Sequence, residues 1–240
     1  MMFFSGAMAN WLNHPPCRPT LSWITPGLIM CRILFAKSDT PFAIAELLRP
    51  FAKLSRDSRE FQGHGWGFAW LEKGEWRQYH NIKPIWEDEF PAAIESTLLL
   101  VHARSAFRDE GIVVENNMPF SDGKSIFIFN GELRGVRIKS EGRIGAEKIY
   151  NYIRRFDKGD QLAALNKGAN IIKKHSTYVR AMNIIMSDGE QHSLSTSYSE
   201  DPDYFQMYQK QTESMNLVCS QPFAGETDWH HIENNSTIAL

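Results

Sequence analysis

Apolar and polar positions along residues 31–240 predict a chain that mixes strands with helices. Apolar runs and two-residue alternation are typical of strands, and they occur at 31–37, 66–72, 75–80, 97–104, 125–129, 178–186, 191–198, 204–209 and 215–219. Helical spacing predicts helices at 143–156 and 160–175, and Thr40 as a cap followed by Pro41 predicts one at 40–48. Strand-rich ends around a central helical pair indicate an α+β protein, and two sheets between helices is one arrangement that fits.

Residues 1–30 differ in composition from the rest of the chain. They contain one charged side chain, Arg18, and four prolines, which suits neither a packed helix nor a paired strand. Asn10 and Asn13 interrupt any apolar core, so a secretory signal is not predicted. We interpret residues 1–30 as an N-terminal extension, either a start assigned too far upstream or a removable leader, with a structural extension as the alternative. Residues 31–240 are expected to form one domain.

Composition changes this picture little. The 240 residues are 42% hydrophobic and 22% charged, with a net charge of −2, which gives no electrostatic footprint for nucleic acid or an anionic membrane. No apolar run approaches the roughly 20 residues of a transmembrane helix. The three cysteines are too far apart for a disulfide framework or paired zinc ligands, and the histidines are scattered, so we expect a cytoplasmic protein without metal or organic cofactor.

Cys31 follows Met30 and opens the first predicted strand. If Met30 or the whole preceding segment is removed, Cys31 carries both a thiol and a free α-amine. A thiol of pKa about 8.5 is little ionised at neutral pH, whereas an α-amine of pKa about 8 can accept its proton. Cys31 is therefore a candidate nucleophile with its own base, and the alternative is a small buried apolar residue on a strand.

Two further stretches carry candidate binding groups. In His64-Gly65-Trp66-Gly67 the glycines would let backbone approach a ligand while the indole of Trp66 forms a wall, although a tight turn also explains them. Arg104 ends an apolar strand. Its guanidinium can bind a carboxylate through two parallel hydrogen bonds, and the alternative is an ordinary ion pair.

Asn130-Gly131 follows the strand predicted at 125–129. The carboxamide of Asn130 and the backbone N–H of Gly131 could both face a developing oxyanion. Asn-Gly is equally the commonest hairpin turn, so both interpretations stay open.

In their sequence order these stretches resemble the class II glutamine amidotransferase family of N-terminal-nucleophile hydrolases, and its small stand-alone members in particular. The matching stretches are Met30-Cys31-Arg32, Gly65-Trp66-Gly67, His102-Ala103-Arg104, Asn116-x-x-Pro119-Phe120, Asn130-Gly131 and Ser220-Gln221-Pro222-Phe223. No single stretch is specific, but six in order are hard to obtain by chance. The resemblance covers about residues 30–240.

The resemblance implies a four-layer αββα sandwich of two mainly antiparallel sheets between helices. It also implies that Cys31 attacks a γ-glutamyl amide, that Asn130 and Gly131 hold the oxyanion, and that Arg104 binds the substrate's α-carboxylate. The other substrate-binding residues that it implies are Trp66, Gly67 and Glu147.

Several departures from the family pattern concern the substrate more than the reaction. Gly145 stands where the family has the aspartate that pairs with the substrate's α-ammonium, and Phe129 and Met118 replace two histidines.

Three functional hypotheses follow from the sequence. The chain is a glutamine amidotransferase-like hydrolase supplying a synthetase or other subunit, a hydrolase of γ-glutamyl peptides or other amides, or a catalytically silent relative that binds a metabolite or partner.

Overall fold

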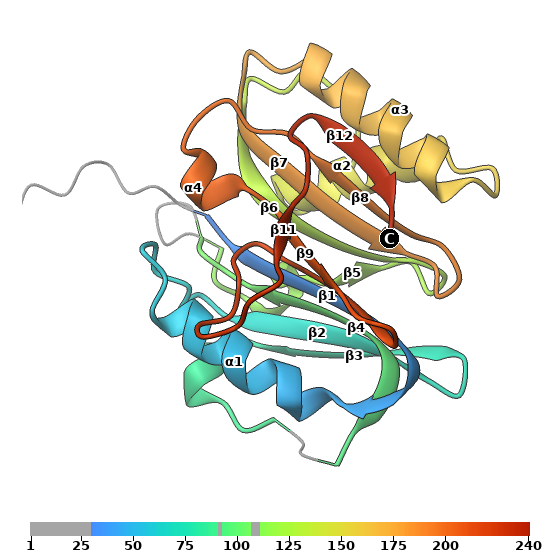
Figure 1. Cartoon of the computed structure of the whole chain (residues 1–240). Coiled ribbons are helices and arrows are strands. Elements are labelled where there is room, and N and C mark those ends of the chain that lie inside the picture. Colours follow the sequence, from blue (N-terminus) through green and yellow to red (C-terminus); the bar gives the residue numbers. More distant parts are fainter. Residues whose placement is uncertain (1–29, 91–92, 107–110) are drawn as a thin grey trace, which may run out of the picture.

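Figure 1 shows the computed structural model, which describes residues 30–90, 93–106 and 111–240. One antiparallel sheet has seven strands, in the order β11-β9-β10-β1-β4-β2-β3. Their bounds are β1 Arg32–Ala43, β2 Trp66–Glu72, β3 Glu75–Asn81, β4 Glu95–Ala103, β9 Tyr208–Gln211, β10 Met215–Cys219 and β11 His230–His231. The second antiparallel sheet has the order β12-β8-β7-β6-β5. Its bounds are β5 Phe120–Ser121, β6 Ile126–Arg134, β7 Tyr178–Ser187, β8 His192–Thr196 and β12 Ser236–Ala239.

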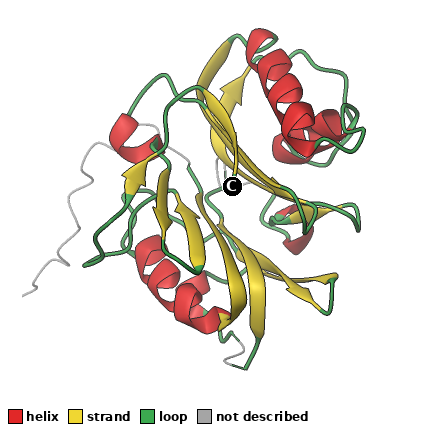
Figure 2. Ribbon diagram, turned by 45° about the vertical axis from the view of Figure 1, so that its right-hand side comes forward, coloured by secondary structure: helices red, strands yellow, loops and turns green. Residues whose placement is uncertain are grey.

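Helices cover the outer faces of both sheets (Figures 1 and 2). Helix α1 (Ile44–Arg56) lies on the seven-stranded sheet, and α2 (Gly145–Arg154) and α3 (Gln161–Lys174) lie on the five-stranded sheet. Within the described residues, the other helical segments are α4 (Pro202–Phe205) and the 3-10 turns η1 (Ile85–Glu87) and η3 (Val114–Asn116). The four layers confirm the expected αββα sandwich.

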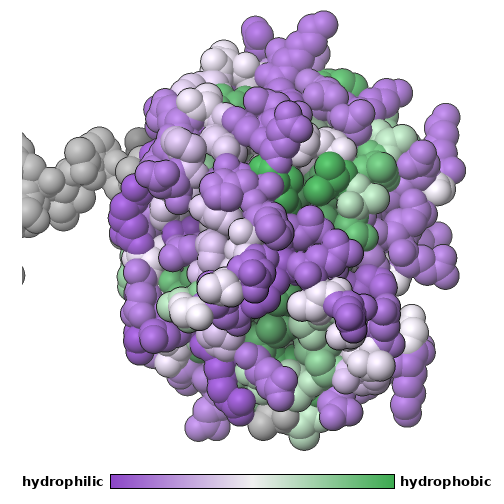
Figure 3. Space-filling view, viewed as in Figure 1, coloured by the Kyte–Doolittle hydropathy of each residue, from purple (hydrophilic) through white to green (hydrophobic). Residues whose placement is uncertain are grey.

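The central strands are apolar on both faces because each sheet is covered twice. In β1, Ile33 and Phe35 pack between the sheets, whereas Leu34 and Ala36 pack with α1. Burial of this kind explains why β1 reads as a continuous apolar run instead of an alternating one. Most of the molecular face seen in Figure 3 is hydrophilic, with apolar side chains confined to smaller areas.

The helix predicted at 40–48 is wrong in position. Thr40 and Pro41 belong to the end of β1, where the register with β4 shifts between Lys37 and Phe42. An irregularity of this kind tolerates a proline, which has no backbone N–H to donate to the hydrogen bonds between the two strands. Helix α1 begins only at Ile44.

Two other predicted boundaries are also corrected. The strand predicted at 204–209 is instead the short helix α4 followed by β9, because Pro202 follows Asp201 and starts a helical turn. Strand β6 does not end at Phe129 but continues through Asn130 and Gly131 to Arg134, paired with β7. The hairpin-turn interpretation of Asn130-Gly131 is therefore wrong.

Other elements match their predictions closely. Strands β2 and β10 have the predicted bounds, and α3 lies within the predicted 160–175, with the Asp160 side chain accepting from the Ala163 N–H at its start. The extension predicted over residues 1–30 falls, except for Met30, outside the described residues and stays a prediction.

Candidate active site

Cys31 lies directly opposite Arg104 at one end of the seven-stranded sheet. The register pairs Arg32 with Ala103 and Ile33 with His102, so continuing the ladder by one residue places Cys31 beside Arg104. Because side chains alternate along a strand, Cys31 and Arg104 share the face of Ile33, which is the face toward the second sheet. The Cys31 thiol donates a weak hydrogen bond to the Ser105 carbonyl, with Sγ and O 3.8 Å apart.

Opposing effects act on the pKa of the Cys31 thiol. Burial raises this pKa, whereas the backbone hydrogen bond at Ser105 and the nearby Arg104 guanidinium act in the other direction. Burial is the larger effect, so the thiol in this arrangement needs a base to become an effective nucleophile.

Arg104 is buried, 7% exposed, without a carboxylate partner in the described part of the chain. Its Nη1 donates to the Gly111 carbonyl at 2.9 Å and to Asn117 Oδ1 at 3.2 Å. These two acceptors fix the direction of the guanidinium, but because they are neutral they do not compensate its charge. Burial lowers the pKa of Arg104. A buried cation of this kind favours an anionic ligand.

Asn130 faces the same space from the opposite sheet. Its β6 neighbour Phe127 stacks on Tyr150 of α2, so the alternating residues 126, 128 and 130 point toward the seven-stranded sheet. Asn130 is 0% exposed, and neither Oδ1 nor Nδ2 has a partner among the described residues. An unsatisfied buried carboxamide is uncommon and indicates a place for a ligand or a catalytic intermediate.

Gly131 is required by packing as well as by any chemistry. A Cβ at this position would lie 2.2 Å from the Ala181 carbonyl oxygen of β7. Every residue except glycine would therefore push β6 and β7 apart at the position next to Asn130.

The indole of Trp66 does not form the expected wall. Trp66 points toward α1, is 0% exposed, and donates from Nε1 to Asp88 Oδ2 at 2.8 Å. Period-two alternation puts Gly67, not Trp66, on the face of Arg104. A Cβ at Gly67 would lie 2.6 Å from the Met118 carbonyl oxygen, so this glycine admits the loop that leads to Asn117 and Pro119.

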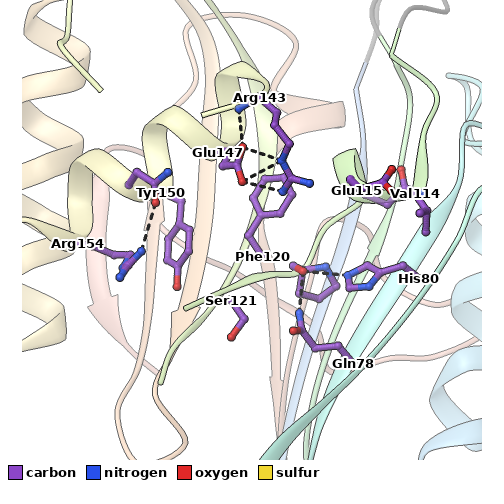
Figure 4. Close-up of a pocket in the computed structure, with 13 residues that line it drawn as sticks. Gln78, His80, Val114, Glu115, Phe120, Ser121, Arg143, Glu147, Tyr150 and Arg154 are labelled. Carbon is purple, nitrogen blue, oxygen red and sulfur yellow. Dashed lines mark hydrogen bonds and ion pairs between the residues drawn. The ribbon is translucent and has the colours of Figure 1, made fainter. Parts of the chain in front are cut away.

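Glu147 lies at the start of α2 and lines a pocket of about 250 Å³ (Figure 4). Arg143 holds its carboxylate, with Nη2 and Oε1 2.7 Å apart, and this ion pair lowers the pKa of Glu147. The pocket is also lined by His80 and Asn117. Because Asn117 accepts a hydrogen bond from Arg104, the pocket adjoins the Arg104 guanidinium. The carboxylate of Glu147 is thus already paired with Arg143.

Met30, which precedes the candidate nucleophile, makes contacts that the sequence did not reveal. Its side chain is 1% exposed and packs with Ala181, Tyr204 and Phe205. Its carbonyl accepts from Gln62 Nε2 at 2.6 Å and from Tyr204 Oη at 3.2 Å. No motif in the sequence indicated this contact, because Gln62 and Tyr204 are far from Met30 along the chain.

Neither a metal centre nor a membrane span emerges from the described residues. No group of three or more His, Cys, Asp or Glu side chains within them is placed to hold a metal ion. Over the same ranges, no helix combines the length and apolarity needed to cross a bilayer.

Comparison with solved structures identifies the fold. A glutamine aminotransferase class-II domain protein from Silicibacter pomeroyi superposes with a TM-score of 0.61 at 17% identity, covering 87% of this chain and 94% of that one. Glutamine phosphoribosylpyrophosphate amidotransferase from B. subtilis, complexed with ADP and GMP, gives a TM-score of 0.66 at 12% identity, covering 87% and 47%. A predicted glutamine amidotransferase from Pseudomonas aeruginosa gives 0.50 at 16% identity, covering 89% and 94%.

The chain therefore has the fold of class II glutamine amidotransferase domains. No protein-family model matches its sequence, and no curated protein matches it significantly. At identities this low, the likeness establishes the architecture and leaves the chemistry to the residues of this chain.

Proposed function

We propose that the protein is an N-terminal-nucleophile cysteine amidohydrolase that cleaves a γ-glutamyl amide with Cys31 as its first residue. The observation that carries the proposal is the pairing of Cys31 with Arg104. The thiol of Cys31 lies beside the buried guanidinium of Arg104, and this guanidinium has no carboxylate partner in the described chain. Such a site suits a substrate that has a carboxylate near its scissile bond. The α-carboxylate of a γ-glutamyl group meets this description.

The first step is attack on the amide carbon. The α-amine of Cys31 takes the thiol proton, the sulfur–carbon bond forms, and the carbonyl oxygen becomes an oxyanion. Asn130 Nδ2 and the Gly131 N–H stabilise that oxyanion. Such donors act strongly in a buried site because they need no reorganisation when the charge develops.

The second step releases the amine and then the acid. The oxyanion re-forms the carbonyl, the carbon–nitrogen bond breaks, and the α-ammonium of Cys31 returns its proton to the leaving nitrogen. Water then adds to the thioester and releases a γ-carboxylic acid, which regenerates the thiol. No metal or organic cofactor is needed for this sequence.

The residues predicted to bind the substrate have different roles in the proposal. Arg104 binds the α-carboxylate, and the backbone around Gly67 borders the same space. Glu147 contributes through Arg143, at the edge of the pocket. The indole of Trp66 has no part in binding. With free glutamine as substrate, a synthetase or other subunit would receive the ammonia, and a cytoplasmic location would suit that role.

A catalytically silent relative is the second candidate, and Met30 is the observation that favours it. Gln62 and Tyr204 hold the intact Met30–Cys31 peptide, whose nitrogen is an amide and cannot act as a base. If residues 1–30 remain attached, Cys31 lacks its proton acceptor and the fold would serve for binding alone.

One experiment separates these candidates. The protein is isolated from its native host, its intact mass is measured, and release of glutamate from glutamine and from γ-glutamyl-p-nitroanilide is followed. A mass that begins at Cys31, with turnover that Cys31→Ala abolishes, is the expected result. A mass that includes Met30 without turnover would favour the silent relative, and turnover in Cys31→Ala would refute the assignment of the nucleophile.

A further inference from the structure

Met30 occupies a formed pocket at the nitrogen of Cys31. The pocket has an apolar wall of Ala181 and Phe205 and two polar groups, the Gln62 carboxamide and the Tyr204 hydroxyl. Gln62 is 0% exposed and donates from Nε2 to the Met30 carbonyl, while its Oε1 has no partner among the described residues. The pocket thus offers a donor and a free acceptor to whatever lies beside the Cys31 nitrogen.

Removal of Met30 would leave these polar groups exposed to an empty space. The Nε2 of Gln62 would keep its 2.9 Å bond to the Glu60 carbonyl but lose the 2.6 Å bond to Met30, and Tyr204 would lose one acceptor. Buried donors and acceptors are costly to leave unmade, so the emptied pocket is suited to a ligand with both an N–H and a carbonyl.

The reaction chemistry says which part of a substrate reaches this pocket. The α-ammonium of Cys31 must donate its proton to the departing nitrogen, so that nitrogen lies within hydrogen-bond reach of the Cys31 nitrogen. Met30 is bonded to that same nitrogen. Once the chain is cut, the space that Met30 occupied is therefore one route by which the substituent of the leaving amine can lie next to the Cys31 nitrogen.

We propose that the pocket of Met30 is the leaving-group subsite, and that the substrate is a γ-glutamyl amide of an apolar amino-acid derivative rather than glutamine itself. This inference rests on the proposed function. Gln62 Oε1 accepts from the leaving N–H, Gln62 Nε2 and Tyr204 Oη donate to its carbonyl, and Ala181 and Phe205 contact an apolar side chain of up to methionine size.

Charge near the pocket restricts the leaving group further. The guanidinium of Arg32 lies 4.0 Å from the centre of the Tyr204 ring, and that of Arg59 lies 4.7 Å from it. Arg59 is paired with Asp201, whereas Arg32 has no carboxylate partner among the described ion pairs, so the charge of Arg32 disfavours a second cation. A leaving amine with a cationic side chain is therefore rejected although it has similar length.

The test compares leaving groups on the protein whose measured mass begins at Cys31. The substrates are glutamine and the γ-glutamyl derivatives of glycinamide, methioninamide and lysinamide, each assayed for glutamate release. We expect kcat/KM for γ-glutamylmethioninamide to exceed that for glutamine by about tenfold or more, since burial of one apolar side chain is sufficient for this. Glycinamide should fall between them, and lysinamide should gain little.

Two variants connect the preference to the pocket. Tyr204→Phe removes the hydroxyl and keeps the ring between the arginines, so the ratio of kcat/KM for methioninamide to that for glutamine should fall about fivefold, as expected for one hydrogen bond. Tyr152→Phe makes the same change on α2, on the outer side of the five-stranded sheet, and should leave the ratio unchanged. A ratio that both variants leave unchanged would refute the role of Tyr204.

The possible outcomes distinguish a failure of the leaving-group subsite from a failure of the proposed amidohydrolase activity. Hydrolysis of glutamine with no gain for methioninamide would overturn the leaving-group subsite and leave the amidohydrolase intact. Hydrolysis of none of the four substrates by a chain that begins at Cys31 would overturn the proposed function itself.

Discussion

Asn117 accepts a hydrogen bond from Arg104 Nη1 at 3.2 Å and donates from its own Nδ2 to the Asn81 carbonyl at 2.8 Å. The second bond fixes the direction of the carboxamide, and the carboxamide in turn orients the guanidinium. Asn116, one residue earlier, instead donates to the Gly111 carbonyl and has no direct hydrogen bond with Arg104. Of the two adjacent asparagines, only Asn117 positions the proposed substrate anchor directly.

Asn117→Ala should therefore weaken substrate binding more than it slows chemistry. Loss of one oriented hydrogen bond corresponds to about 1 kcal/mol, so we expect KM for a γ-glutamyl amide to rise about fivefold while kcat changes by less than about threefold. Asn116→Ala is the matched control and should raise KM less. Equal effects of the two variants on KM would contradict the assignment of Asn117 as a positioning residue.

Asn130 and Asn183 form a second matched pair, because they are cross-strand neighbours on β6 and β7 and both are fully buried. Asn183 donates to the Phe205 carbonyl and accepts from Thr196 Oγ1, whereas Asn130 has no partner in the described chain. Asn130→Ala should lower kcat about 10²- to 10³-fold with little loss of stability. Asn183→Ala should cost about 1–3 kcal/mol in the free energy of unfolding.

Steady-state kinetics and urea unfolding of both variants check this prediction. A stability loss in Asn130→Ala as large as that in Asn183→Ala would mean that Asn130 has a structural role. Unchanged turnover in Asn130→Ala would remove it from the oxyanion site.

Gly145→Asp tests whether a carboxylate at position 145 would bind the α-ammonium of the substrate. A Cβ at Gly145 meets no atom within 4 Å, so the new side chain fits without strain at the first residue of α2. If this position faces the α-ammonium, the carboxylate should improve the binding of free glutamine by about 10- to 150-fold, equivalent to one charge-assisted hydrogen bond.

N-acetylglutamine, which has no ammonium, should not gain from Gly145→Asp, and the wild type should discriminate little between it and glutamine. Gly145→Asn, of the same shape without the charge, is the control for both substrates. A strong wild-type preference for free glutamine, with no gain from the aspartate, would place the ammonium partner elsewhere.

Two buried histidines predict how stability depends on pH. Burial, followed by the charges of Arg104 and His80, lowers the pKa of His102 to about 3, and burial, followed by Lys37, lowers the pKa of His192 to about 4. The unfolded chain takes up these protons near pH 6.5, so it binds more protons than the native state between about pH 6.5 and 4. Stability should therefore fall as the pH drops through this range, by up to about 1.4 kcal/mol per pH unit for each histidine.

Urea unfolding at several pH values between 7 and 4.5 measures the slope. His192→Gln should reduce the contribution of one histidine to that slope while leaving a polar partner near Ser187 Oγ, which contacts the ring at 2.8 Å. An unchanged slope in this variant would mean that His192 does not titrate as described.

The local pattern of apolar and turn residues was sufficient to predict many of the strands and helices. Strands β2 and β10 have their predicted bounds because each is a short apolar run that ends at turn residues, and α3 is limited by Asp160, which caps its start. The expectation of two sheets between helices came from the order of elements and from a resemblance carried by six short stretches. The proposed roles of Cys31, Arg104 and Asn130 rest on residue type and order, which are properties of the sequence.

Tertiary structure decided what depends on contacts between distant segments. Pairing with β7 continued β6 through Asn130, where local chemistry equally allowed a turn. Period-two alternation is local, but only the position of α1 determined that Trp66 points away from Arg104. The contacts of Met30 with Gln62 and Tyr204 join residues 32 and 174 positions apart. No local propensity encodes such contacts, since they form only when segments that are distant in the sequence pack together.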